Sequence, residues 1–311
     1  MTKYRTNLPQ LNGKRILTDG GLETVLVFQE GIDLPLFAAF HLLDREDGPD
    51  WLRAYFDRYI PLAKRAGTGL LLESVTWRAS PDWTTQLGMT DADMARINRE
   101  SIALLEAVRG AHETEAMPMV ISGCVGPRGD GYDPGITMTM DAAEAYHAAQ
   151  INVLADTAAD MISALTMNNV EEAIGLTRAA QGADIPVAIS FTVETDGRLP
   201  TGQTLGEAVA QVDAETGNGP AYFMINCAHP THFEAVLAGN PRIRGLRANA
   251  SMCSHEELDN CEELDDGNPV ELGSQFAVLL RDNPQLTVLG GCCGTDHRHI
   301  EQIGLAVKAA A

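Results

Sequence analysis

The chain has 311 residues, of which 45% are hydrophobic and 21% are charged, and its formal net charge at pH 7 is −21. This composition is typical of a globular protein with a large core. The negative charge is spread along the sequence, which argues against a nucleic-acid partner, because nucleic acids are bound by basic surfaces. No apolar run approaches the roughly 20 residues that cross a membrane. We therefore expect a soluble protein that binds neither nucleic acids nor membranes.

The N-terminal segment 1–14 is polar and has no apolar stretch of the kind found in secretory signals. We therefore expect a cytoplasmic protein. In such a compartment, six cysteines in a chain of this length fit reduced thiols or a metal site better than a disulfide framework.

Short apolar runs alternate with stretches of helical period along the whole sequence. The runs predict eight strands, at 15–18, 69–75, 119–122, 160–165, 186–191, 222–225, 243–247 and 286–289. The stretches predict helices at 50–66, 91–108, 141–158 and 169–180, one from 205, a short one ending at 238, and others at 269–282 and 295–309. Asp141 and Asn169 are the expected N-caps of two of them.

This alternation has no linker or low-complexity break. Repeated strand–helix units with apolar strands indicate a parallel sheet covered by helices. Eight such units in about 300 residues predict one (β/α)₈ TIM barrel domain over residues 1–311, with a doubly wound open sheet as the alternative. The unusual residues stand at the ends of the expected strands, and in a barrel these ends meet on one face. They are Asp19-Gly20-Gly21, Thr76-Trp77, Cys124, Thr192, Asn226-Cys227 and Cys292-Cys293.

The cysteines carry the clearest chemical signal. Cys292 and Cys293 are adjacent on a glycine-rich turn, where a bond between them would strain their shared peptide. Cys227 ends another strand on the same rim. Three thiolates around a zinc ion would leave its fourth position for a substrate, as in catalytic zinc sites. The alternative is that Cys227 is a small buried apolar residue and that the pair merely lines the barrel mouth.

Six segments of the chain carry a family resemblance. In chain order they are Leu17-Thr-Asp-Gly-Gly-Leu-Glu-Thr24, Thr76-Trp-Arg-Ala-Ser80, Gly123-Cys-Val-Gly-Pro127, Ile189-Ser-Phe-Thr192, Asn226-Cys227 and Gly290-Gly-Cys-Cys-Gly-Thr295. With these segments, in the same order, the chain resembles the zinc-dependent homocysteine S-methyltransferase family, which includes betaine– and S-methylmethionine–homocysteine methyltransferases. The resemblance implies a (β/α)₈ barrel with a zinc ion held at its C-terminal face by a cysteine after strand 6 and a cysteine pair after strand 8, here Cys227, Cys292 and Cys293.

The resemblance further implies an enzyme that moves a methyl group from a sulfonium or quaternary ammonium donor to a zinc-activated thiol. Homocysteine, giving methionine, is the expected acceptor. A free alkyl thiol has a pKa near ~8.5, and zinc coordination would deprotonate it. The leaving group of such a donor is neutral, so no acid catalyst is required.

Several residues of the matched segments are candidates for substrate contact. Asp19, which is also the catalytic candidate, and Glu23 could meet an amino group or a cationic donor. Their alternatives are a turn-forming aspartate and a surface glutamate. Gly20 and Gly21 would let the backbone approach a ligand closely. Trp77 could face a methylated cation through its ring, or could be a core aromatic residue.

Thr192 and Asn226 could orient polar groups of the substrate. Three departures from the family pattern concern the amino-acid and donor pockets, and one of them is Trp77, which stands where the family usually has a tyrosine. Leu165 stands where the family usually has a glutamate that helps to hold the amino acid, and Phe37 replaces a common tryptophan. These departures leave the predicted zinc site intact but leave open a thiol acceptor other than homocysteine.

Two other kinds of function remain open. A zinc hydrolase could use Asp19 as a general base, although three thiolates favour a bound thiolate over an activated water. A non-catalytic zinc–thiol barrel is the other alternative. The acidic segment 251–267 carries Cys253, His255 and Cys261, but their spacing matches no zinc motif, so we expect a solvated loop. A homo-oligomer and a separate corrinoid partner also remain open.

Overall fold

The computed structural model describes residues 2–237, 239–261 and 263–310. Eight parallel strands form a closed barrel in sequence order, which confirms the predicted (β/α)₈ fold. The expected end of one helix, residue 238, lies outside the described residues. The strands are β1 (Ile16–Leu17), β2 (Gly69–Glu73), β3 (Met119–Val125), β4 (Met161–Met167), β5 (Val187–Phe191), β6 (Tyr222–Asn226), β7 (Ile243–Ala248) and β8 (Val288–Gly291).

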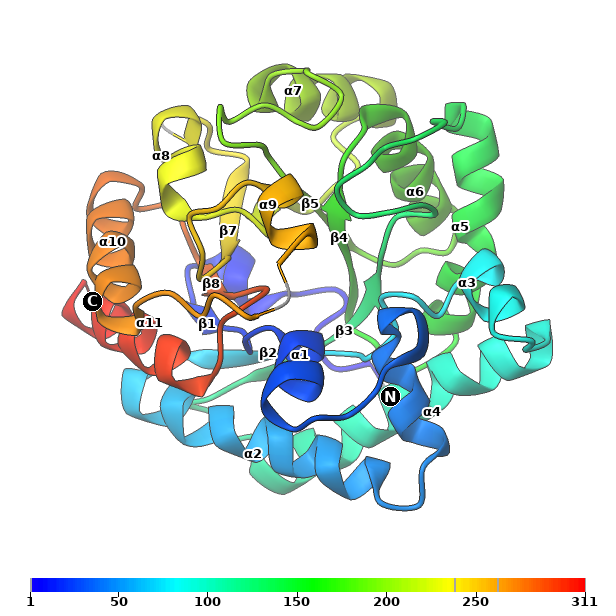
Figure 1. The fold of residues 1–311 in the computed structure, drawn as a ribbon, viewed down its shortest axis with the longest axis horizontal. Helices are drawn as coiled ribbons and strands as arrows, with labels where there is room; N and C mark the ends of the chain where they lie inside the picture. Colours follow the sequence, from blue (N-terminus) through cyan, green and yellow to red (C-terminus); the bar gives the residue numbers. More distant parts are fainter. Residues whose placement is uncertain (1, 238, 262, 311) are drawn as a thin grey trace.

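The helices surround this barrel (Figure 1). The long ones are α2 (Gly48–Ala66), α4 (Asp91–His112), α5 (Met140–Ala155), α6 (Val170–Gly182), α7 (Leu205–Thr216), α10 (Pro269–Asp282) and α11 (His297–Ala309). Shorter helices are α1 (Leu22–Thr24), α3 (Pro81–Gln86), α8 (Pro230–Leu237) and α9 (His255–Asp259). Thr139 rather than Asp141 caps α5, because its side chain accepts the Ala142 amide, whereas Asn169 caps α6 as predicted. No helix among the described residues is long and apolar enough to cross a membrane.

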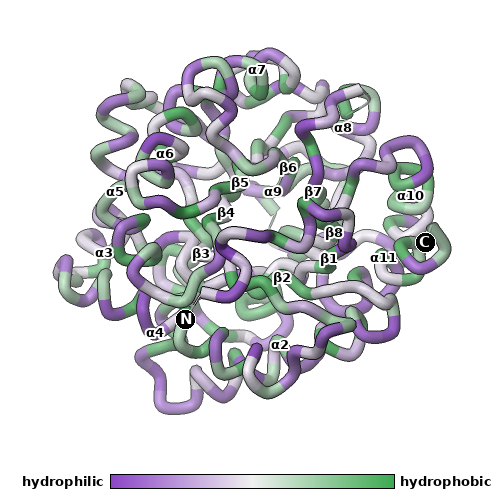
Figure 2. Tube along the Cα trace, turned by 180° about the vertical axis from the view of Figure 1, so that it is seen from behind, coloured by the Kyte–Doolittle hydropathy of each residue, from purple (hydrophilic) through white to green (hydrophobic). Residues whose placement is uncertain are grey.

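The strands are buried over almost their whole length, and the helices around them contain both hydrophobic and hydrophilic residues (Figure 2). On α2 the buried face includes Leu52, Tyr55 and Phe56, which recur at helical spacing. The N-terminal segment packs against the end of the barrel where the strands begin. There the backbone amides of Lys3 and Tyr4 each donate to Asp160 Oδ1 at 2.8 Å. The strand ends that carry the chemistry are therefore left at the other face.

Most described residues of the segment 251–267 are exposed, as expected for a solvated loop, but the segment also has regular structure. It contains the short helix α9, whose Ser254 cap accepts the Glu257 amide. In Figure 1, α9 lies over the strands near the centre of the barrel face. His255 is buried, because polar partners and an aromatic ring in the barrel mouth surround its imidazole. Described residues of this segment, such as Ser251 and Leu258, therefore form part of the wall of the site.

Candidate metal centre

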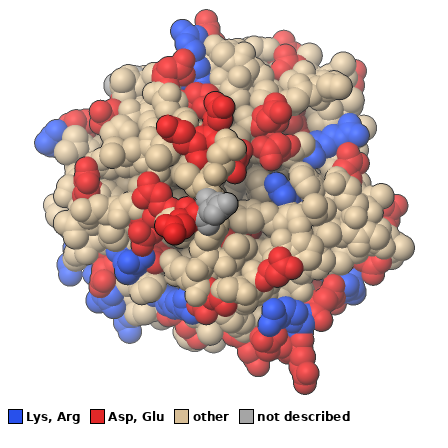
Figure 3. Space-filling model, in the orientation of Figure 1, with Lys and Arg blue, Asp and Glu red and all other residues tan. Residues whose placement is uncertain are grey.

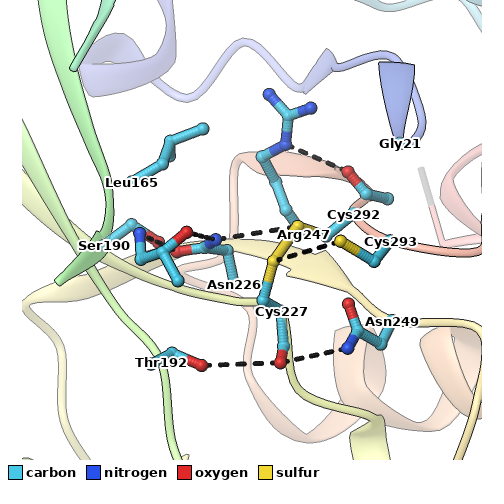
Figure 4. Close-up of a disulfide and its surroundings, with 12 residues drawn as sticks. Gly21, Leu165, Ser190, Thr192, Asn226, Cys227, Arg247, Asn249, Cys292 and Cys293 are labelled. Atoms are coloured by element: carbon cyan, nitrogen blue, oxygen red, sulfur yellow. Dashed lines mark hydrogen bonds between the residues drawn. A yellow bond between two sulfur atoms is a disulfide. The ribbon is translucent and has the colours of Figure 1, made fainter. Parts of the chain in front are cut away.

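Three thiols converge at the C-terminal face of the barrel. Cys227 follows β6, and Cys292 and Cys293 follow β8. Only β7 separates these two strands in the barrel. Their sulfur atoms all lie within 4.8 Å of one another, and the Sγ atoms of Cys227 and Cys293 are 3.9 Å apart (Figure 4). The structure joins Cys227 to Cys292 in a disulfide. This differs from the expected free thiols, because sulfur atoms gathered this closely can be oxidised to a disulfide.

The spacing of these sulfurs fits a zinc ion once the disulfide is reduced. Ligands about 2.3 Å from a tetrahedral zinc ion lie about 3.8 Å from each other. The separation of 3.9 Å between Cys227 and Cys293 is close to this value. Burial raises the pKa of the Cys293 thiol to about 11, so a neighbouring cation would be needed to hold it as a thiolate. Cys253 and Cys261 do not join a group of this kind among the residues that the structure describes.

The backbone of Cys227 is held in an unusual conformation. Its φ of 54° is left-handed, which costs a non-glycine residue about 1–3 kcal/mol. Its carbonyl accepts hydrogen bonds from His255 Nε2 at 2.7 Å, Asn249 Nδ2 at 3.1 Å and Thr192 Oγ1 at 3.4 Å. Figure 4 shows Thr192 and Asn249 on either side of this carbonyl. These donors fix the direction in which Cys227 presents its sulfur.

Two side chains donate to the other sulfurs. Asn226 Nδ2 lies 3.7 Å from Cys292 Sγ, and the Tyr132 hydroxyl lies 3.7 Å from Cys293 Sγ. The Tyr132 ring also stacks on the His255 imidazole, with centroids 3.9 Å apart and planes at 10°. The predicted residue Asn226 therefore contacts the thiol cluster. Tyr132 and His255 were not predicted for this site, because no local spacing joins them to the cysteines.

The glycines of the first strand end pack against the cysteine turn. A Cβ on Gly21 would lie 2.5 Å from the carbonyl oxygen of Cys292, and one on Gly20 would lie 2.6 Å from that of Thr295. The Gly21 amide donates to the Thr295 carbonyl at 2.9 Å. Gly20 and Gly21 line the cavity, and the absence of a Cβ at each also lets this strand end pack against the cysteine turn.

Asp19 belongs to a buried group of charged side chains. Its Oδ1 accepts from Arg247 Nη2 at 2.6 Å, and its Oδ2 accepts from the Tyr55 hydroxyl at 3.1 Å. Burial raises the pKa of Asp19, and Arg247 opposes that rise. Glu73 Oε1 lies 3.6 Å from Arg247 Nη1. Glu73 and Arg247 were not predicted for this site, although charged residues near the ends of apolar strands are a usable signal.

A cavity of about 390 Å³ opens beside the thiols. Thr192 is fully buried behind Cys227 and does not line this cavity. Leu165 and Phe37, which both depart from the family pattern, do line it. The other predicted site residues also line it: Asp19, Gly20, Gly21, Glu23, Trp77, Asn226, Cys227, Cys292 and Cys293.

The entrance to the cavity is framed by aromatic and charged side chains. Arg78 packs against Trp77 and Trp83, at 5.0 Å and 4.0 Å from the ring centroids, and its Nη1 donates to the Leu36 carbonyl. Burial raises the pKa of Glu23 to about 7. Figure 3 shows acidic side chains around a hollow near the centre of this face. Asp130, Asp259, Glu263 and Asp265 are acidic residues of the cavity lining.

Comparisons with known proteins agree with this geometry. The chain is 25% identical over 325 residues to methionine synthase from Mycobacterium leprae, a match that covers 98% of this chain and 25% of that protein. The chain thus spans about a quarter of this relative's length.

Two solved structures of the homocysteine methyltransferase MmuM from Escherichia coli share the fold. The oxidised form matches with a TM-score of 0.74 and 21% identity, over 93% of this chain and 94% of that one. The metallated form matches with a TM-score of 0.74 and 20% identity, over 98% of this chain and 99% of that one. Residues 16–307 match the family described as homocysteine S-methyltransferase. The chain therefore belongs to the homocysteine S-methyltransferase family of enzymes.

Proposed function

We propose that this chain is a zinc-dependent thiol methyltransferase in which Cys227, Cys292 and Cys293 hold the metal and homocysteine is the acceptor. The observation that carries the proposal is the convergence of three sulfur atoms, within 4.8 Å of one another, on one wall of the cavity. All the groups invoked here belong to one barrel, so we propose that residues 1–311 act as a single catalytic domain.

The chemistry requires a thiolate at neutral pH and an aligned methyl donor. A zinc ion bound by the three cysteines would lower the pKa of a thiol that completes its coordination. Asn226 and Tyr132 donate to two of the cysteine sulfurs and restrain the orientation of the cluster. The acceptor sulfur then forms a bond to the methyl carbon while the donor's own bond to that carbon breaks. The donor leaves as a neutral molecule, so the protein's main task is alignment.

The cavity entrance suits a cationic donor. Acidic side chains outnumber basic ones around the hollow in Figure 3, and the chain carries a net charge of −21, so a sulfonium or quaternary ammonium ion would be attracted to this face. Trp77 lines the cavity and could contact the methylated cation through its ring. We therefore propose an onium donor, with Glu23 and Trp77 on the donor side.

The hydrolase alternative has less support. A general base must be free to take a proton from a metal-bound water. Asp19 was the candidate, but its two oxygens already accept from Arg247 and Tyr55. We therefore propose that Asp19 is a positioning residue that orients Arg247.

The direct test is methyl transfer by reduced, zinc-loaded protein. Homocysteine would be incubated separately with S-methylmethionine and with glycine betaine, and methionine would be measured by mass spectrometry. We expect methionine with at least one donor and none after Cys293→Ala. Methylation of another thiol but not of homocysteine would contradict the proposed acceptor. Zinc-dependent hydrolysis without any thiol methylation would contradict the proposed reaction.

A further inference from the structure

Two charged side chains in the cavity wall have polar atoms without a hydrogen bond. Both carboxylate oxygens of Glu73 and the Nη1 atom of Arg247 have no hydrogen-bond partner among the described residues. Each residue is only 5% exposed, and both line the cavity. Buried polar atoms are nearly always satisfied, and leaving charged ones unsatisfied is costly. Such atoms on a cavity wall indicate a ligand that completes their hydrogen bonding.

The remaining bonds of Arg247 fix the direction of its free nitrogen. Nε donates to the Gly291 carbonyl at 3.0 Å, and Nη2 donates to Asp19 at 2.6 Å. Nη1 then faces Glu73 at 3.6 Å, which is longer than a normal hydrogen bond. A cationic donor group and an anionic acceptor group therefore stand side by side. The complementary ligand has a carboxylate and an ammonium on the same carbon atom, as an α-amino acid does.

This charged pair lies next to the thiol cluster. Arg247 is paired in register with Asn226 on β6 and Gly290 on β8, the strands that lead to the cysteines. The Cys227 amide donates to the Arg247 carbonyl at 3.1 Å. In Figure 4 the Arg247 side chain extends away from the sulfurs, and the Leu165 side chain points into the same region. A short amino acid could therefore place its sulfur at the thiols and its charged end at Arg247.

We propose that Arg247 and Glu73 bind the α-carboxylate and the α-ammonium of the acceptor amino acid, and so select homocysteine over thiols that lack an amino-acid group. This inference rests on the proposed thiol methyltransferase function. It also accounts for Leu165, because Glu73 on β2 supplies a carboxylate that the apolar side chain of Leu165 on β4 does not. Burial raises the pKa of Glu73, and Arg247 opposes that rise. The resulting pKa is about 6, so the carboxylate is ionised at neutral pH.

The experiment compares three thiols that differ only in their charged groups. Homocysteine carries both groups, 4-mercaptobutyrate lacks the ammonium, and 3-aminopropanethiol lacks the carboxylate. Binding to the reduced, zinc-loaded protein would be measured by isothermal titration calorimetry for wild type, Glu73→Gln and Arg247→Lys. Glu234→Gln, an exposed change of the same type on α8, is the matched control.

We expect wild type to bind homocysteine at least about tenfold more tightly than either truncated thiol, since hydrogen bonds to charged groups contribute about tenfold to a hundredfold in affinity. Glu73→Gln should lower the affinity for homocysteine by about that factor and leave the affinity for 4-mercaptobutyrate unchanged. Arg247→Lys should lower the affinity for homocysteine and for 4-mercaptobutyrate but not the affinity for 3-aminopropanethiol. Glu234→Gln should match wild type. The Ser122 and Ser163 hydroxyls lie near the Glu73 carboxylate, and a glutamine oxygen can also accept from them, so Glu73→Gln should fold even if Arg247→Lys does not.

Two results separate the inference from the function on which it rests. Equal affinity of wild type for homocysteine and 4-mercaptobutyrate, or equal weakening of both by Glu73→Gln, would overturn the inference and leave thiol methylation intact. Failure of all three thiols to bind zinc-loaded wild type would instead contradict the proposed function, and the inference would fall with it.

Discussion

His255 gives the sharpest test of how the fold presents Cys227. Its Nε2 atom makes the shortest of the three hydrogen bonds to the Cys227 carbonyl, at 2.7 Å, and its ring stacks on Tyr132. A net hydrogen bond contributes about 0.5–1.5 kcal/mol, and an aromatic stack contributes a similar amount. His255→Ala therefore removes about 1–3 kcal/mol of interactions that orient Cys227 and Tyr132. Loss of support of this kind typically lowers metal affinity by about 10–100-fold.

The assay is competition for zinc between the reduced protein and a chromophoric chelator. His232→Ala is the matched control, because His232 also contacts the segment 251–267, through the Met252 carbonyl at 3.0 Å, but has no contact with Cys227 given by the structure. We expect His255→Ala to lose about 10–100-fold in zinc affinity and His232→Ala to stay close to wild type. Equal affinities for wild type and a folded His255→Ala protein would refute the reasoning.

Three further predictions concern the same face. Gly21→Ala should displace the cysteine turn, because the new Cβ would lie 2.5 Å from the Cys292 carbonyl oxygen. It should therefore lower zinc affinity in the same chelator assay. Gly206→Ala should leave zinc affinity unchanged, because a Cβ there meets nothing within 4 Å. Burial raises the pKa of Glu23 to about 7, so the folded state holds its proton where the unfolded state has lost it, and stability should fall as pH rises from about 4.5 to 7. Urea unfolding at pH 5 and pH 7 should show a smaller fall for Glu23→Gln, and an identical fall would contradict this assignment. Asp296→Ala should cost about 1–2 kcal/mol in urea unfolding, because Asp296 caps α11, whereas Asp296→Asn should retain most of the cap.

The barrel was predictable because its signals are local. Each buried strand is a short apolar run, and each helix has apolar residues at helical spacing, so all eight strands were found with only small shifts at their ends. The convergence of Cys227 with Cys292 and Cys293 was also predictable. It follows from the rule that all strand ends of a parallel barrel meet on one face.

The contacts that complete the site were not predictable, because they join residues far apart in sequence. Arg247 meets Asp19 across 228 positions, and neither strand end indicates the other. His255 looked like part of a solvated acidic loop, yet it is buried because its imidazole supports the Cys227 carbonyl. Thr192 was expected to touch substrate, but it donates to that same carbonyl. Such roles depend on which side of a strand end a side chain faces.

We propose above all that three cysteines hold a zinc ion, which accepts a thiol as its next ligand. The most direct measurement is metal content together with zinc-edge X-ray absorption, on reduced wild type and Cys292→Ala, with and without homocysteine. We predict about one zinc per wild-type chain with three sulfur ligands, a fourth sulfur when homocysteine is added, and loss of zinc from Cys292→Ala. Reduced wild-type protein that binds no zinc, or zinc whose sulfur ligands are unchanged in Cys292→Ala, would contradict the account.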